Sequence, residues 1–271
     1  MLNKKIILTR PYGQTSNIFF QHAYFDAFCR EHEIKFVNPY MQSYYKDYPH
    51  LNEHGRSKLM DYLTRKLLKK KLKWKMIKSV DFDDLDKVPA YDDYILNSRE
   101  TTLYCEGWYF RHTDLMIKYR KVYQHLFAPD VDKAEMQKSY LTKTNDQLLI
   151  AVHIRRGDYK EYLDGRYFYD DALYIDKVGE LVNALGRDYK LIIFTNDPVL
   201  NEAVYRSHFG NLIISRNNVK TDHYLMSQCD YIIGPPSRFS LWASYMGDKP
   251  YYHIYEPEEQ VTLDKFEKMY A

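Results

Sequence analysis

Two adjacent arginines stand directly after an apolar run near the middle of the chain. The stretch HIRRGDY, residues 153–159, follows LLIAV, and such an apolar run is typical of a buried strand. Arginine carries a planar fork of donors that matches the oxygens of a phosphate, and it stays charged at any relevant pH. Arg155 and Arg156, with His153 just before them, therefore predict a site for a diphosphate rather than for a single carboxylate.

Asp158 could hold one of the two guanidinium groups in place. Successive strand residues point to opposite faces, so His153 and Arg155 should point one way and Arg156 the other if the extended conformation continues. The alternative is a surface ion pair between arginine and aspartate, which contributes little to stability. Such a pair does not explain why the charges gather at the end of a strand, and the pattern favours the phosphate site.

The elements that must position these residues repeat through the C-terminal half. From residue 147 onward, apolar strand-like runs alternate with segments that have the apolar spacing of helices. Helices between parallel strands bring the strand ends and the loops after them around one crevice, where ligands bind. Four such loops carry polar residues: HIRRGDY, TNDP, SRNNVKTD and GPPSRFS.

The N-terminal part opens with the same alternation. Residues 6–8 predict a strand, residues 17–32 have helical spacing of apolar residues, and residues 34–39 predict a second strand. The turn after the first strand contains Gly13 but lacks the GxGxxG pattern, so a dinucleotide-binding fingerprint is absent.

Composition limits the class of protein. The 271 residues are 45% hydrophobic with a formal net charge of +2, which predicts a globular protein and does not suggest nucleic-acid binding. The apolar run IIL near the N-terminus is too short for a signal peptide or membrane anchor. The three cysteines have no metal-ligand spacing, which disfavours a disulfide framework or a zinc site and suggests the cytoplasm.

Residues 58–78, KLMDYLTRKLLKKKLKWKMIK, form a basic amphipathic segment. Its larger apolar side chains gather near one helical face and its basic side chains near the other; the apolar set is Leu59, Leu63, Leu67, Leu68, Leu72 and Met76. One interpretation is a solvated surface helix, balanced by the acidic run DFDDLD that follows. The other is a helix on an anionic membrane surface, where each positive charge contributes about 1 kcal/mol. The acidic run has DxD spacings that could hold a metal, but no buried strand precedes it, so we interpret it as solvated charge.

The motif HIRRGDY resembles the HxRRxD motif of GDP-fucose-dependent fucosyltransferases, that is, of the α1,2-fucosyltransferase family and its α1,6 and protein O-fucosyltransferase relatives. Residues 13–23, GQTSNIFFQHA, resemble the N-terminal GGLGNQMFQYA of that family. FTNDP at 194–198 resembles its FSDD-type strand end, and residues 222–244 resemble its D-x-x-LMS-x-C segment and NSSFSWW-like turn. Because the four matches occur in order over most of the chain, it is similar to a bacterial member of this family.

The resemblance implies a GT-B-like fold of two Rossmann-like α/β domains. Residues 1–145 would form the acceptor-side domain with the basic segment 58–78, and residues 146–271 the nucleotide-sugar-binding domain. The implied reaction is inverting transfer of L-fucose from GDP-fucose to a glycan hydroxyl, with an α1,2 linkage, in surface polysaccharide synthesis. No metal and no cofactor beyond the donor is expected. The glycan acceptor could be lipid-linked, at the inner face of a membrane.

The resemblance also implies roles for individual residues. Arg155 would bind the diphosphate and stabilise the charge on the leaving group. Asp158, Glu161 and Asp164 are candidates to take the proton of the acceptor hydroxyl, and Asp158 is a less available base if it pairs with an arginine. The remaining expected substrate-binding residues are Asn17, His153, Arg156, Asn196, Asp197, Asp222, Ser237, Arg238, Phe239 and Ser240.

The chain departs from the family pattern at three places. Ser16 stands where the family has a glycine, Ile18 replaces a glutamine, and PPSR at 235–238 stands where NSS is usual. The Cβ of Ser16 disfavours a positive φ, so the first turn should differ in shape. Two alternative functions stay open: transfer of another nucleotide sugar by the same fold, and nucleotide-sugar binding without catalysis.

Overall fold

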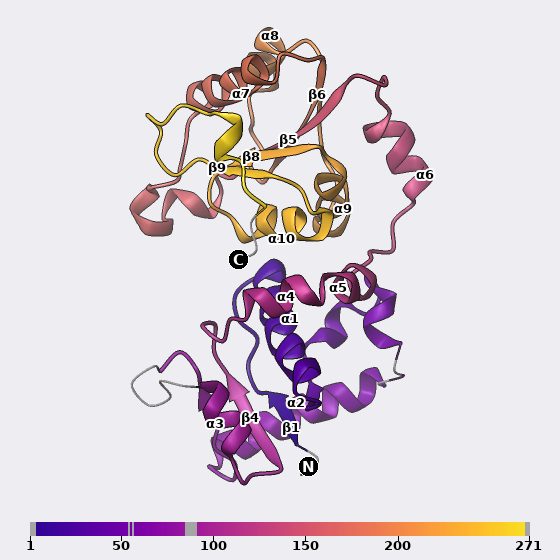
Figure 1. The fold of residues 1–271 in the computed structure, drawn as a ribbon, viewed down its shortest axis with the longest axis vertical. Coiled ribbons are helices and arrows are strands. Elements are labelled where there is room, and N and C mark those ends of the chain that lie inside the picture. The colour runs from indigo at the N-terminus through magenta and orange to yellow at the C-terminus, as the bar shows by residue number, and fades with distance from the viewer. Residues whose placement is uncertain (1–3, 54, 56, 85–90, 269–271) are drawn as a thin grey trace. The chain divides into compact units, whose positions relative to one another are not determined.

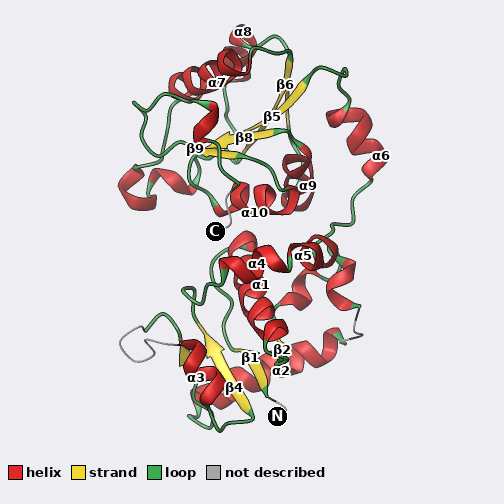
Figure 2. Cartoon of the chain, viewed as in Figure 1, coloured by secondary structure: helices red, strands yellow, loops and turns green. Residues whose placement is uncertain are grey.

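The computed structural model describes residues 4–53, 55, 57–84 and 91–268, and the chain divides into two compact units, Met1–Asp130 and Val131–Ala271 (Figure 1). Helices and strands alternate in both, and each is built around a parallel sheet (Figure 2). The predicted α/β class is confirmed. Within the described residues, no helix has the length and apolar character needed to span a bilayer.

Unit 1, Met1–Asp130, has a sheet in the order β2-β1-β4-β3. All its paired strands are parallel: β1 Lys5–Leu8, β2 Lys35–Val37, β3 Val80–Asp81 and β4 Thr102–Glu106. The helices between and after these strands are α1 Thr15–Glu31, η1 Met41–Tyr44, η2 Pro49–Asn52, α2 Lys58–Lys73, α3 Tyr91–Asn97, α4 Thr113–Lys118 and α5 Arg120–Leu126, of which η1 and η2 are 3₁₀ turns.

Helix α1 forms the centre of the unit 1 core. Phe19, Phe25 and Phe28 are fully buried on it, and Phe25 stacks on Phe110 with ring centroids 4.2 Å apart. Such aromatic pairs stabilise beyond the area that they bury. The helix starts at Thr15, so Ser16 lies inside its first turn, and the positive φ of this turn is found at Gly13 instead. The Cβ of Ser16 therefore meets no positive φ here, because that position has helical angles.

The acidic run after α2 is better integrated than its composition suggests. Val80 and Asp81 form strand β3, and Phe82 is fully buried. The carboxylate of Asp83 accepts hydrogen bonds from the backbone N–H groups of Trp108 and Tyr109. The interpretation as solvated charge is therefore wrong for Asp83, whereas Asp81 is exposed; Leu85 and Asp86 lie outside the described residues.

Unit 2, Val131–Ala271, has a five-stranded parallel sheet in the order β7-β6-β5-β8-β9. Its strands are β5 Leu148–Ile154, β6 Tyr189–Thr195, β7 Leu212–Ile214, β8 Tyr231–Gly234 and β9 Tyr251–His253. The main helices are α7 Asp171–Leu185, α8 Glu202–His208, α9 Val219–Gln228 and α10 Arg238–Gly247. Figure 2 shows α7 and α8 on one side of the sheet and α9 and α10 on the other.

The strand order places a switch point beside β5. From β5 the chain builds outward through β6 to β7, then returns to add β8 and β9 on the opposite side. Loops diverge where the order reverses, and they leave a crevice outside the carboxyl ends of the strands. By this rule a ligand would bind at the carboxyl ends of β5 and β8, where HIRRGDY and GPPSRFS begin, and we call this region the crevice of unit 2.

Unit 2 begins before its first strand. Helix α6 Lys133–Met136 and the π-helical turn η3 Gln137–Leu141 belong to it, whereas the sequence placed the domain boundary after residue 145. Turn η3 packs on α9, and Leu141 is buried. A helical segment this short shows no apolar periodicity, so the sequence does not indicate to which of the two units it belongs.

Candidate functional site

All three nitrogens of the Arg156 guanidinium donate hydrogen bonds. Its Nε donates to the carbonyl of Tyr169 at 3.0 Å, Nη1 donates to Asp197 at 3.1 Å, and Nη2 donates to Asp171. Its side chain is 14% exposed. An arginine with this many fixed acceptors organises the loops around it, because each bond to a charged group restricts one segment relative to another.

Arg155 is bound quite differently. Its Nε and Nη2 donate to the two oxygens of Asp158 at 3.0 and 2.7 Å, in a bidentate pair, and its guanidinium lies over the ring of Tyr159. Asp158 itself is 47% exposed. The carboxylate of this pair therefore faces solvent, although the Arg155 side chain is only 17% exposed, and an incoming anion would compete with an exposed carboxylate rather than a buried one.

His153 connects β5 to the first turn of α10. Its Nδ1 lies 2.5 Å from the hydroxyl of Ser240, which is fully buried. Burial, with smaller effects of Arg155 and His223, lowers the pKa of His153 to about 3. The ring is thus neutral at neutral pH and serves as a hydrogen-bonding group. Phe239 lies between His153 and His223, at centroid distances of 5.2 and 4.2 Å.

The loop after β8 runs close to the loop after β5. Tyr159 donates its hydroxyl hydrogen to the carbonyl of Pro236, and Ser237 caps α10 by accepting from the N–H of Phe239. At Gly234 an added Cβ would lie 2.6 Å from the carbonyl oxygen of His153, so only glycine fits at this strand end. The N-terminus of α10 and the Arg155 guanidinium thus belong to neighbouring loops, and both attract anions.

Asn196 and Asp197 follow β6 and join the same network. Asn196 accepts from the backbone N–H of Arg156 at 2.9 Å, and its amide packs where a Cβ on Gly157 would meet it at 2.7 Å. Asp197 is 9% exposed and binds Arg156. Both residues hold the arginine loop in shape.

Asp222 lies on α9, opposite the end of β7. Its carboxylate accepts from the hydroxyl of Ser215 at 2.5 Å. Burial raises the pKa of Asp222 to about 6, although the bond from Ser215 opposes this effect. A partly buried carboxylate with a raised pKa is a candidate for ligand binding, because donors on a ligand would stabilise its charged form.

The three candidate bases fall into two groups. Asp158 has its pKa lowered, chiefly by the hydrogen bonds from Arg155, and so it is occupied as an arginine partner. Glu161 lies between the 3₁₀ turns η4 Asp158–Lys160 and η5 Tyr162–Gly165, and Asp164 lies within η5. Both residues are exposed. Leu163 and Asp164 both have positive φ, at 49° and 55°.

Asn17 is the one candidate site residue in unit 1. It lies in the first turn of α1, and a Cβ on Gly13 would lie 2.2 Å from its amide nitrogen. All other candidate residues belong to unit 2, where hydrogen bonds and ring contacts join most of them around the crevice.

Several residues of the site were not found from the sequence. Asp171 and Tyr169 hold Arg156, and Tyr159 supports Arg155. Only Tyr159 had a signal, because it ends the motif HIRRGDY. His253 ends β9 opposite Gly234, and neither of its ring nitrogens has a hydrogen-bond partner among the described residues. Burial lowers its pKa to about 3.

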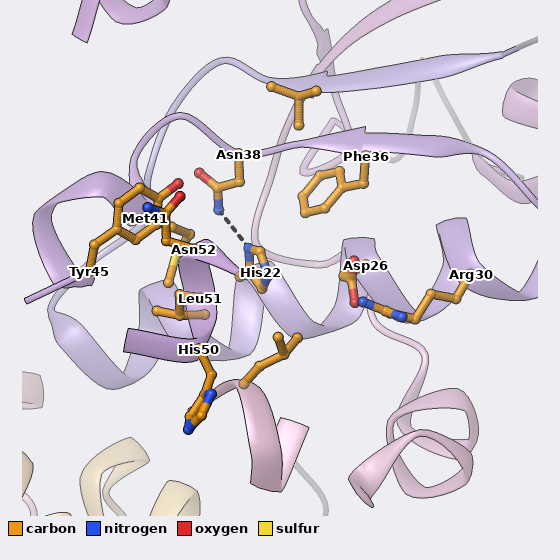
Figure 3. Close-up of a pocket in the computed structure, with 12 residues that line it drawn as sticks. His22, Asp26, Arg30, Phe36, Asn38, Met41, Tyr45, His50, Leu51 and Asn52 are labelled. Atoms are coloured by element: carbon orange, nitrogen blue, oxygen red, sulfur yellow. Dashed lines mark hydrogen bonds and ion pairs between the residues drawn. The ribbon is translucent and has the colours of Figure 1, made fainter. Parts of the chain in front are cut away.

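Unit 1 has a separate pocket of about 120 Å³. Figure 3 shows Asn38 turned toward His22, and these side chains lie 3.2 Å apart, Nδ2 to Nδ1. Burial lowers the pKa of His22 to about 4, so this ring is also neutral. The opposite wall comes from η1, η2 and the end of α5, through Met41, Tyr45, His50, Leu51, Asn52 and Leu126.

Comparison with protein families gives one match over nearly the whole chain. The model of glycosyl transferase family 11 matches residues 9–265. Galactoside alpha-(1,2)-fucosyltransferase 1 of Rattus norvegicus is 29% identical over 111 residues, covering 38% of this chain and 29% of the rat protein. The nodulation protein Z of Azorhizobium caulinodans is 23% identical over 160 residues, or 48% of each chain. The matched regions thus cover less than half of the length of these two relatives.

Solved structures match over a larger share. A mutant of Arabidopsis thaliana FUT1 in complex with GDP aligns with a TM-score of 0.60 and 11% identity, over 96% of this chain and 72% of that chain. The NodZ alpha-1,6-fucosyltransferase soaked with GDP-fucose aligns with a TM-score of 0.58 and 12% identity, over 95% and 98%. At this identity the likeness shows the fold, and the predicted GT-B-like fold is confirmed.

Proposed function

The chain belongs to glycosyl transferase family 11, and on this premise we propose that it transfers L-fucose from GDP-fucose to a glycan hydroxyl, with inversion and in an α1,2 linkage. Relatives named as α1,2-fucosyltransferases support the linkage. The observation that carries the proposal is that the loops after β5 and β8 adjoin, since Tyr159 bonds to Pro236, and that these loops supply Arg155 and the N-terminus of α10.

The donor binds through its diphosphate. The guanidinium of Arg155 meets the phosphate oxygens, and the first N–H groups of α10 point to the same anion. Arg156 keeps the loop rigid from the other side through Asp171 and Asp197. Asp222 accepts from N–H donors of the base, for which the guanine edge is suited. Each contact uses a group that the fold has already oriented.

Transfer is a single displacement at the anomeric carbon. The bond from this carbon to the β-phosphate oxygen breaks, and its electron pair leaves with GDP. The acceptor oxygen bonds to the carbon from the opposite face, while its proton passes to a carboxylate. Arg155 stabilises the charge that grows on the diphosphate, which a divalent cation does in other enzymes. The proton acceptor is Glu161 or Asp164, since Asp158 pairs with Arg155.

A ligand panel tests the donor and the reaction separately. Thermal unfolding is measured with GDP, GDP-fucose and UDP, with and without chelator. GDP at 100 times its Kd should stabilise by roughly 2.7 kcal/mol, and UDP by much less. Equal stabilisation by UDP contradicts the donor and favours another nucleotide sugar. GDP binding without fucose transfer to any galactoside acceptor favours a binding protein without catalysis.

Helix α2 suggests where the reaction takes place. Leu59, Leu63 and Leu67 follow one another at four-residue spacing, so they form one stripe, and they are 63%, 43% and 55% exposed. Leu68 instead packs inward with Ile7 and Val37. The leucines thus lie on two faces, one of which points away from the sheet of unit 1.

Basic side chains of α2 flank this exposed leucine stripe. Asp61 is the only acidic residue of α2, and it is buried, where it accepts from the hydroxyl of Tyr45 at 2.7 Å. The basic residues of the segment are Lys58, Arg65, Lys66, Lys69, Lys70, Lys71, Lys73, Lys75 and Lys78. An apolar stripe flanked by basic side chains fits an anionic lipid surface. We propose that α2 and Trp74, which is 68% exposed, dock the enzyme on a membrane that carries a lipid-linked acceptor.

A further inference from the structure

Three potential metal ligands converge in unit 1, although they are far apart in the sequence. His50 lies in η2, Glu53 follows η2, and His125 lies near the end of α5, 72 residues after Glu53. One ligand atom from each residue lies within 4.8 Å of the other two. No other group of three or more histidines, cysteines or acidic residues with this geometry occurs among the described residues.

The two imidazoles aim at one carboxylate oxygen. The Nδ1 of His50 is 2.6 Å from Oε1 of Glu53, and Nε2 of His125 is 2.5 Å from the same oxygen. The two rings lie side by side with centroids 4.3 Å apart. Two rings fixed against one oxygen direct their nitrogen lone pairs into a common space once the nitrogens are unprotonated.

The ligand chemistry of this cluster selects a class of metal. Two imidazole nitrogens and one carboxylate oxygen suit Zn²⁺ and similar transition-metal ions, whereas Mg²⁺ and Ca²⁺ prefer oxygen ligands. We propose that His50, Glu53 and His125 bind one divalent transition-metal ion of the zinc type, with its fourth position open to water.

The geometry requires only small movements. Metal–ligand bonds of about 2.0–2.2 Å in a tetrahedron place ligand atoms roughly 3.3 Å apart. The contacts to Glu53 are shorter than this, so the ion would enter by moving the three side chains slightly apart. Glu53 and His125 have side chains that are 38% and 55% exposed, which leaves them room to turn. The surface position also gives the ion a direct path from solvent.

The site joins two elements that form a wall of the unit 1 pocket. His50 lines this pocket (Figure 3). Leu126, the residue after His125, lines it as well. A bound ion would fix η2 to the end of α5 and so hold this wall in one position. The proposed fucose transfer does not pass through the site, and a failure of either proposal leaves the other intact.

Metal-stripped full-length protein provides the test. The unfolded chain cannot bring His50 and His125 together, so binding to the folded state should raise the unfolding temperature. We expect one Zn²⁺ per chain at micromolar or lower free concentration, and a rise of several degrees. Co²⁺ should give the visible absorption of a low-symmetry, nitrogen-bound ion, and Mg²⁺ should do nothing.

Two variants and one matched control decide the ligands. Glu53→Gln keeps the shape of the side chain, and His125→Ala removes a ring. Each should weaken Zn²⁺ binding by well over tenfold, since even groups that only support a ligand contribute roughly that much. His208→Ala, at an exposed histidine of unit 2, should bind as the wild type does. Unchanged binding in Glu53→Gln, or no stoichiometric binding by the wild type, overturns the proposal.

Discussion

The two strongly basic regions of the molecule use their charge in opposite ways. In the crevice of unit 2, each motif arginine has an acidic partner, and Arg156 is nearly enclosed by its acceptors. On α2 the only acid is turned inward, and the lysines stand beside exposed leucines. Fixed, paired charge suits recognition of one small anion, whereas exposed charge along a helix suits a surface of many anions. A count of basic residues in the sequence does not distinguish a site for one small anion from a surface that binds many anions.

The largest effect is expected at Arg155. Arg155→Ala should lower kcat/KM for fucose transfer roughly a hundred- to a thousandfold, the scale of losing one preorganised electrostatic contact. Arg155→Lys should not restore the rate, because an ammonium group cannot bridge two oxygens as the guanidinium does. Steady-state kinetics with GDP-fucose measures both. If both variants react at nearly the wild-type rate, the crevice has been assigned to the wrong step.

The next effect concerns the surface charge of α2. Changing Lys69, Lys70 and Lys71 to Glu should weaken binding to anionic vesicles by at least about a hundredfold, since each lysine near the surface contributes about 1 kcal/mol and the new carboxylates are repelled. Co-sedimentation with vesicles measures the change. Wild-type binding should also fall with added salt, because screening acts within about 10 Å at 0.1 M.

Transfer to a soluble acceptor is the control for the α2 variant. It should stay at the wild-type level, because the three lysines belong to helix α2 of unit 1 and none of the proposed donor contacts of unit 2 involves them. A wild-type protein that binds neutral and anionic vesicles equally at low salt would show that α2 is only a solvated face.

A substitution at Arg156 tests whether this arginine stabilises the fold while Arg155 binds the donor. Arg156→Ala should lower the free energy of unfolding by about 2 kcal/mol, because Asp171 and Asp197 lose a charged partner in a largely enclosed place. Arg155→Ala should change stability much less, since Asp158 can turn to solvent. Urea unfolding of both variants gives the comparison. Equal losses would mean that the structural and binding roles are not divided between them.

The smallest effect concerns the pH dependence of stability. The folded-state pKa of His253 is about 3, below the value of about 6.5 for an unfolded chain. The unfolded state therefore binds more protons between these values, and stability falls as pH falls from about 6.5 toward 3. His253→Phe keeps a ring between Tyr251 and Tyr255 and should reduce the loss between pH 7.5 and pH 5.

Urea unfolding at the two pH values measures this reduction. His208→Phe serves as the control, since His208 is exposed. Identical pH dependence in His253→Phe and the wild type would contradict a buried, neutral His253.

The sequence predicted the ends of β5 and β8 well because strand ends are local features. HIRRGDY and GPPSRFS each follow an apolar run, and parallel strands end at one edge, so their loops must meet. It predicted α2 less well, because a helical stripe of leucines has the same spacing whether it packs inward or faces outward. The ligand set of His50, Glu53 and His125 had no signal, since only the fold of unit 1 brings residues of η2 and α5 together.

The left-handed turn at Leu163 and Asp164 has a consequence for the proposed reaction. Non-glycine residues adopt these angles at a cost of roughly 1–2 kcal/mol each, and the bonds Arg166 N–H to Leu163 and Phe168 N–H to Gly165 help to keep the turn. These two bonds give the loop a defined turn in the structure, with Glu161 and Asp164 exposed on it. In the proposed reaction an acceptor hydroxyl would meet a carboxylate on a turn that already has this shape.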